Sequence, residues 1–212
     1  MPVAVELVRG AGIEVLLRPD PVTADAAAIA ELLDFEDAED WAEDAAAWLA
    51  VQPDCGAAMG GPVDTVCAEG RGTVAVMTGL TALESLAGQE PVPAVRRHIG
   101  GPHDGLVLNW LSGQSALDPA TVDPLRLVSG LVDVLAVMMD IGGPEEVVAA
   151  FDQGAEEKQQ LELLDHIWRL NHPRLADVLQ AVGAHHPTKP IAKAARKALI
   201  RHRSWLANPP GR

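Results

Sequence analysis

The fold is decided by residues 158–205, which read KQQLELLDHIWRL, NHP, RLADVLQAV, GAHHP and TKPIAKAARKALIRHRSW in turn. The first, third and fifth pieces carry apolar residues at three- and four-residue steps, the spacing of an amphipathic helix. The junctions hold the residue types that mark helix ends: Asn171 and Thr188 suit N-caps, Pro173 and Pro190 suit first turns, and Gly183 suits a C-terminus. The stretch therefore predicts three short helices joined by tight turns.

Within it, residues 175–199 (LADVLQAVGAHHPTKPIAKAARKAL) resemble a HEAT or armadillo-type helical repeat. Leucines are spaced along the first helix, a Pro-bearing loop follows, and Ala194, Ala195 and Ala198 lie where the second helix would pack closely. Residues 92–111 resemble a degenerate form of the same unit, although no exact period of 34 or 40 residues runs along the chain. The C-terminal segment is also similar in style to the ends of proteins from high-GC bacteria. The resemblance implies a stack of helical hairpins that offers a binding or scaffolding surface, because such repeats seldom carry catalysis.

The rest of the chain continues the helical pattern. An apolar stripe from Phe35 to Leu49 recurs near the helical period, and the run from Leu125 to Asp140 is apolar on most of its circumference, as expected of a central helix. Further helices are predicted at 24–34, 73–87, 92–99 and 105–111, the last capped by Asp104, and after Gly142-Gly143-Pro144. By contrast, the Gly- and Pro-rich residues 52–72, which hold both cysteines, predict a long loop.

The N-terminus predicts a different element. Two apolar runs in residues 2–18 flank Gly10-Ala11-Gly12, a pattern that favours a β-hairpin. The predicted fold class is therefore mainly α, an irregular HEAT-like stack of helical hairpins with a short N-terminal β-hairpin. The predicted divisions are a hairpin appendage over residues 1–22, a helical domain over 23–205 and a disordered tail over 206–212.

Charge is unevenly placed along the 212 residues, whose formal net charge is −14. Residues 185–212 contain Lys and Arg but no Asp or Glu, so the C-terminal end of the sequence is basic whereas the chain as a whole is acidic. Two cysteines, no signal-like N-terminus and no uninterrupted apolar span predict a reduced, cytoplasmic protein that does not cross a membrane.

The basic end is the candidate binding site. It consists of Lys189, Lys193, Arg196, Lys197, Arg201 and Arg203, while Ile191, Ala195, Ala198 and His202 occupy another face of the same predicted helix. Four readings remain open for these cations: the solvated outer face of a terminal capping helix, docking onto the chain's own acidic segment Asp34–Asp44, a surface for a protein partner, or a surface for nucleic acid. The net charge of the rest of the chain disfavours nucleic acid.

Other motifs carry little chemistry. The pairs His166 and His172, and His185 and His186, are expected at helix ends and in loops rather than at a metal, because no metal-ligand spacing accompanies them. Residues 140–143 predict a helix stop and restart, and residues 70–73 are a weak anion-site candidate. No serine lies in a nucleophile-elbow motif.

The sequence therefore predicts a non-enzymatic protein–protein interaction module, an adaptor or regulatory subunit of a larger assembly, without catalytic residues, cofactor or metal. The alternative is a nucleic-acid-associated regulator that uses the basic C-terminal helix.

Overall fold

The structure is a computed structural model, and it describes residues 20, 23–32, 38–84, 86 and 91–208. These residues form helices and no strand, so the protein is mainly α and the β component of the predicted fold class is wrong for the part of the chain that is described. The hairpin expected at 2–18 lies outside these residues. Within the same ranges, no helix is both long and apolar enough to cross a membrane.

The N-terminal half consists of short helices. They are α2 (Ala26–Glu31), α3 (Ala38–Ala50), α4 (Cys55–Ala58), α5 (Gly60–Val66), α6 (Thr73–Glu84), α7 (Val92–Arg96) and α8 (Asp104–Gly113). Their apolar faces share one core, built around Trp41, Leu49, Val63 and Leu83. Three indole N–H groups in this core donate to backbone carbonyls, as buried tryptophans require: Trp41 to Ile29, Trp48 to Ala24 and Trp110 to Leu80, at 2.7 to 3.0 Å.

The C-terminal half contains longer elements. A short 3₁₀ turn η2 (Pro119–Thr121) leads into α9 (Pro124–Gly142), followed by α10 (Pro144–Gly154), α11 (Glu157–His166), the 3₁₀ turn η3 (Ile167–Arg169), α12 (Leu175–His185) and α13 (Lys189–Ala207). The second core lies among them, around Leu135, Leu175, Leu179 and Ile191. Helices α12 and α13 pack side by side, so residues 175–199 form the helical pair that the sequence predicts.

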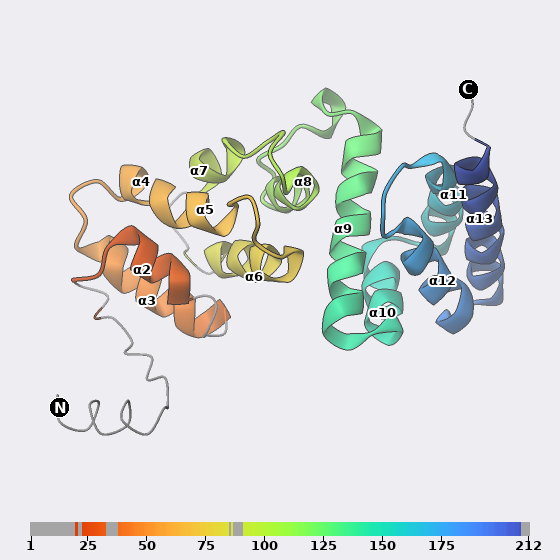
Figure 1. Ribbon diagram of the computed structural model, residues 1–212, viewed down its shortest axis with the longest axis horizontal. Helices are drawn as coiled ribbons and strands as arrows, with labels where there is room; N and C mark the ends of the chain where they lie inside the picture. Colours follow the sequence, from red (N-terminus) through yellow and green to blue (C-terminus); the bar gives the residue numbers. More distant parts are fainter. Residues whose placement is uncertain (1–19, 21–22, 33–37, 85, 87–90, 209–212) are drawn as a thin grey trace.

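Helix α9 joins the two halves. It contacts α6 and α8 on one side and α10 and α12 on the other, and Figure 1 shows it standing between them. The prediction that this apolar helix is central is therefore confirmed. Gly143, with φ of +79°, separates α9 from α10 in a backbone region that favours glycine, as the stop-and-restart motif predicts.

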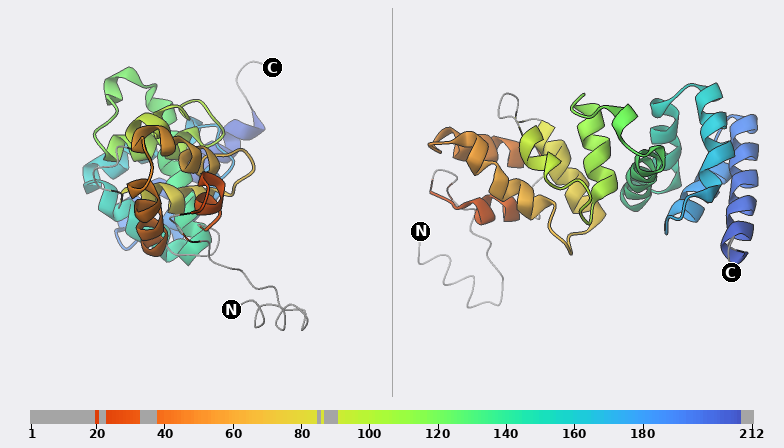
Figure 2. Two further views of the ribbon diagram at one scale, coloured as in Figure 1. Left: turned by 90° about the vertical axis from the view of Figure 1, so that its left-hand side faces the viewer. Right: turned by 90° about the horizontal axis from the view of Figure 1, so that it is seen from above.

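The molecule is elongated, with α3 and α13 at opposite ends (Figures 1 and 2). Helix α3 holds the described part of the acidic segment 34–44. The basic helix therefore does not dock on that part of the segment within one chain, and the solvated reading of its charge stays open beside the two partner readings.

Two local predictions are wrong. Residues 52–72 are not a long loop, because α4 and α5 form there and bury Val63 and Val66 against the first core. Asp104 is the first residue of α8 rather than its cap; its carboxylate accepts from the Gly100 amide at 2.6 Å and pairs with Arg126 at 2.6 Å.

The side-chain bonds at the starts of α12 and α13 also differ from the prediction. Neither Asn171 nor Thr188 caps a helix with its side chain. Instead, His172 Nδ1 accepts the Arg174 amide at 3.2 Å and His186 Nδ1 accepts the Thr188 amide at 3.1 Å. The capping role expected for the histidines is thus present, through these two residues.

Candidate protein-binding groove

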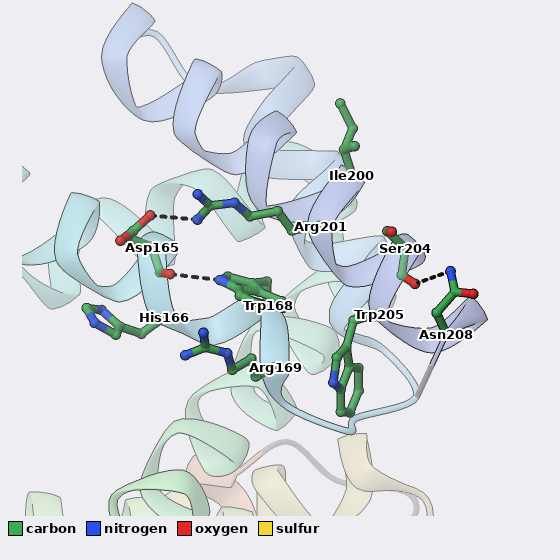
Figure 3. A pocket seen from close by; sticks show the side chains of 9 residues that line it. All are labelled: Asp165, His166, Trp168, Arg169, Ile200, Arg201, Ser204, Trp205 and Asn208. Carbon is green, nitrogen blue, oxygen red and sulfur yellow. Dashed lines mark hydrogen bonds and ion pairs between the residues drawn. The ribbon is translucent and has the colours of Figure 1, made fainter. Parts of the chain in front are cut away.

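A hollow of about 730 Å³ opens at the C-terminal end of the molecule, between η3 and the second half of α13. We call it the tryptophan groove, since Trp168 and Trp205 line it from the two sides (Figure 3). Its other lining residues are Asp165, His166 and Arg169 from the α11–η3 side, and Ile200, Arg201, Ser204 and Asn208 from the α13 side.

The turn at η3 places the first indole. Ile167 is buried in the second core, so the next two side chains of the tight 3₁₀ turn, Trp168 and Arg169, are directed outward. The Trp168 indole N–H donates to the Asp165 carbonyl at 2.9 Å, which fixes the ring across the end of α11. The Arg169 guanidinium lies 4.4 Å from the centroid of the same ring, a cation–π contact.

His202 connects the two sides of the groove. This side chain is 1% exposed, and its Nδ1–H donates to the Trp168 carbonyl at 2.9 Å. Its ring also stacks on Trp205, with centroids 6.2 Å apart and planes 25° from parallel. One buried imidazole therefore bonds to the backbone of η3 and stacks on the Trp205 indole, and its burial confirms that His202 belongs to the buried face with Ile191, Ala195 and Ala198.

An ion pair spans the groove. Arg201 Nη1 lies 2.8 Å from Asp165 Oδ1, and the hydrogen bond from Arg201 holds the pKa of the Asp165 carboxyl below its usual range, with smaller contributions from Lys197 and His166. The Arg201 guanidinium also lies 5.7 Å from the Trp168 ring. A smaller hollow of about 90 Å³ lies on the other side of this pair, beside Lys197. The carboxylate of Asp165 is thus neutralised within the protein.

The remaining lining is exposed and consists of Ile200, Arg169 and the polar side chains of His166, Ser204 and Asn208. Ile200 is 70% exposed, although it lies on a helix whose inward face is packed with alanine and isoleucine. Arg169 is exposed and has no carboxylate partner among the residues that the structure describes. An exposed isoleucine, two half-buried indoles and an unpaired cation therefore meet at one place.

The structure divides the six predicted contact residues. The three arginines bond within the protein: Arg196 to the Gly183 carbonyl, Arg203 to Gln180 Oε1 at 3.2 Å, and Arg201 to Asp165. Gly183 lies inside α12 rather than at its end, and its missing side chain makes room for Arg196.

The three lysines remain solvated. Lys189, Lys193 and Lys197 are exposed on α13, and none forms an ion pair or hydrogen bond with a described residue. Of the three, Lys197 lies beside the groove, while Lys189 and Lys193 lie on the first turns of the helix. Of the six predicted contact residues, Arg201 therefore lines the groove and Lys197 lies next to it, in the adjoining hollow.

A second hollow, of about 330 Å³, lies between the α9–α10 junction and α12 and is lined in part by Arg174 and Asp177. Its arginine is fully engaged, because Arg174 forms two bonds of 2.8 and 3.0 Å with Asp140 and one of 3.2 Å with Asp177. Among the described residues, this second hollow therefore offers no unpaired charged side chain to a protein partner, and the tryptophan groove is the stronger candidate for a binding site.

In the weak anion-site candidate at residues 70–73, the one cationic side chain is engaged within the protein. Arg71 donates to the backbone carbonyls of Thr65 at 3.1 Å and Ala30 at 3.3 Å, which makes it a tie between α2 and α5. No three His, Cys, Asp or Glu side chains gather in a metal-binding arrangement within the described ranges.

Sequence reasoning missed Trp168, Arg169 and Ile200. Trp168 and Arg169 fall at the end of a predicted helix, and nothing local shows that they face α13, some thirty residues later. Ile200 carried a readable signal, because it lies at a four- and three-residue step from Arg196 and Arg203, on the charged face rather than the apolar one.

Comparisons of the chain with protein-family models, with curated proteins and with solved structures found no match.

Proposed function

We propose that the protein is a non-enzymatic interaction module, an adaptor or regulatory subunit, that binds a protein partner in the tryptophan groove. The observation that carries the proposal is the coincidence of exposed apolar, aromatic and cationic side chains in one hollow at the end of an elongated helical molecule. Interfaces are enriched in Trp and Arg at their energetic centres, and this groove presents two of each.

The rigidity of the groove supports the proposal. His202 bonds to the backbone at Trp168 and stacks on the Trp205 indole, and the Arg201–Asp165 pair links the two sides of the groove. A surface that is already ordered loses little conformational freedom when a partner binds, which favours affinity. The position at one end of the molecule leaves the remaining helices free to hold a second element of an assembly.

The proposal is tested by affinity capture from a lysate of cells that produce the protein, with the full chain as bait. Two matched variants replace an exposed isoleucine by glutamate: Ile200→Glu inside the groove, and Ile141→Glu at the end of α9, where the side chain is 59% exposed. Proteins that bind through the groove should be lost with Ile200→Glu and retained with Ile141→Glu.

Circular dichroism and thermal unfolding check that both variants remain folded. Equal recovery of the same proteins by both variants and the unchanged chain would reject the groove as the binding site.

A further inference from the structure

We infer that the segment held in the tryptophan groove is an acidic peptide segment with an aromatic or large aliphatic anchor; this inference rests on the proposed function and specifies its partner. The groove combines the apolar surface of Trp205 and Ile200, which we call the apolar seat, with the cation Arg169, and Lys197 lines the adjoining hollow beyond the Arg201–Asp165 pair.

Charge indicates the acidic character of the segment. The one carboxylate that lines the groove, Asp165, is already neutralised by Arg201 at 2.8 Å, whereas Arg169 and Lys197 have no carboxylate partner among the described residues. The whole of residues 185–212 adds cations and no carboxylate. The unpaired charge at the groove is therefore positive, although the net charge of the whole chain is negative. A peptide segment rich in Asp and Glu would complement this positive charge.

The apolar seat indicates the anchor. Trp205 stacks on His202 and lines the groove, and Ile200, which lines it further along α13, is 70% exposed; Figure 3 shows the two side chains at opposite ends of this stretch of the helix. A Trp, Phe or Leu side chain laid against either of them would remove apolar surface from water. Such an anchor is worth far more than the exposed ion pairs around it.

The same side chains fit single-stranded nucleic acid poorly. Successive bases need several free aromatic faces, but Arg169 and Arg201 both lie against the Trp168 ring, at 4.4 and 5.7 Å, and His202 stacks on Trp205 with the ring centroids 6.2 Å apart. These contacts leave too little free aromatic surface for a run of stacked bases.

The test measures binding by fluorescence anisotropy with defined probes and the full chain. The main probe is a short labelled peptide in which Glu and Asp flank a Trp-Leu pair. Three comparison probes remove one property each: the same peptide with Ser-Ala in place of Trp-Leu, the same peptide with Gln and Asn in place of the acids, and a labelled oligothymidylate of similar length. The main probe should bind best, and its affinity should fall as salt rises.

Three variants locate the binding. Trp205→Ala should weaken the main probe by at least about tenfold, the size expected for an indole anchor. Arg169→Glu should weaken it by roughly threefold to tenfold. Lys189→Glu changes the net charge by the same amount but lies about 24 Å from Trp205 along α13, well beyond a Debye length of about 8 Å, so it should change affinity by less than about twofold.

Equal binding of the uncharged peptide, tighter binding of the oligonucleotide, or equal effects of Arg169→Glu and Lys189→Glu would each overturn the inference. Concentration-dependent self-association that Trp205→Ala abolishes, without peptide binding, would assign the groove to a second copy of the chain and overturn it as well. If lysate capture depends on Ile200 while no peptide binds, the partner chemistry is wrong and the proposed function stands. If capture is indifferent to Ile200, the proposed function itself fails.

Discussion

His186 Nε2 lies 2.8 Å from Asp152 Oδ1, and this contact ties the entry of α13 to α10. Because His186 Nδ1 accepts the Thr188 amide, the ring hydrogen is on Nε2 and is donated to the carboxylate. One helix earlier, His172 repeats the arrangement with Asp133 of α9, at 2.9 Å. Each histidine precedes a proline, so the same His-Pro pair begins two successive helices and anchors each to an earlier one.

Removal of the His186 imidazole should destabilise the protein. The side chain is 1% exposed, and the variant His186→Ala would leave the Thr188 amide without its acceptor and create a cavity beside Phe151. We expect a loss of about 2–4 kcal/mol in the free energy of unfolding, measured by denaturant titration.

The neighbouring residue provides the control. His185 is exposed, so His185→Ala should change the free energy of unfolding by less than about 0.5 kcal/mol. A similar loss in both variants would show that the contact with Asp152 does not stabilise the entry of α13.

The crossing of α8 and α9 depends on two glycines. A methyl group at Gly130 would collide with the backbone carbonyl of Gly105, so Gly130→Ala should force the helices apart and cost about 1–3 kcal/mol. At Gly113, the last residue of α8, a methyl group meets no atom within 4 Å, and Gly113→Ala should be neutral or stabilising by up to about 1 kcal/mol. Thermal unfolding of the two variants measures the difference, and a stable Gly130→Ala protein would contradict the close approach.

Acid should weaken the link between α9 and α12. The hydrogen bonds from Arg174 hold the pKa of the Asp140 carboxyl below its ordinary value of 3.8. Because the folded pKa is lowered, this stabilisation is present above that value and is lost as pH falls toward the folded pKa. The pair is more than one-third exposed, so the contribution is about 1 kcal/mol or less.

The measurement is the free energy of unfolding from pH 6 downward, for the unchanged chain and for Asp140→Asn. The two curves should converge as the medium becomes acidic. Parallel curves would show that the Arg174 contact contributes nothing that depends on the protonation of Asp140.

The two cysteines should differ in reactivity. Burial raises the pKa of the Cys67 thiol to about 11, with a smaller contribution from Asp64, whereas Cys55 is partly exposed. A thiol reagent at neutral pH should modify Cys55 first and reach Cys67 only when the protein opens. Rapid modification of the native Cys55→Ser variant would contradict this.

Since the pKa of the Cys67 thiol is raised in the folded protein, the protein should also lose stability as pH rises beyond 9.0, the ordinary pKa of a cysteine thiol.

Much of the helical layout could be predicted because its signals are local. The three-piece pattern of residues 158–205 gave α11, α12 and α13 within a few residues, and the apolar run at 125–140 gave α9. The composition of residues 52–72 gave a wrong prediction, because their Gly and Pro content favours a loop. Short helices form there nevertheless, since the burial of Val63 and Val66 in the core stabilises them. Thr188 occupies the N-cap position of α13 as predicted, but neither it nor Asn171 caps through its side chain, and the imidazoles of His172 and His186 accept the nearby backbone amides instead.

The site could be predicted only in part. A basic face on α13 was visible in the spacing of its lysines and arginines, but the spacing could not show which of them the protein already uses. The bonds that engage these side chains join residues far apart in the sequence. Arg201 bonds to Asp165, 36 positions earlier, and His202 bonds to Trp168, 34 positions earlier, where α13 packs on α11 and η3. Each pair uses different residue types, so no repeated motif marks them along the chain.

By itself, the sequence determined where the helices of the C-terminal half form and which faces they bury, because periodicity and turn residues act over only a few positions. Tertiary structure alone decided that Trp168 and Arg169 meet Ile200 and Trp205 in one groove, and that the acidic and basic ends stay apart. The physical reason is that packing distances between helices, and the ion pairs and hydrogen bonds they permit, depend on three-dimensional placement that local propensity does not encode.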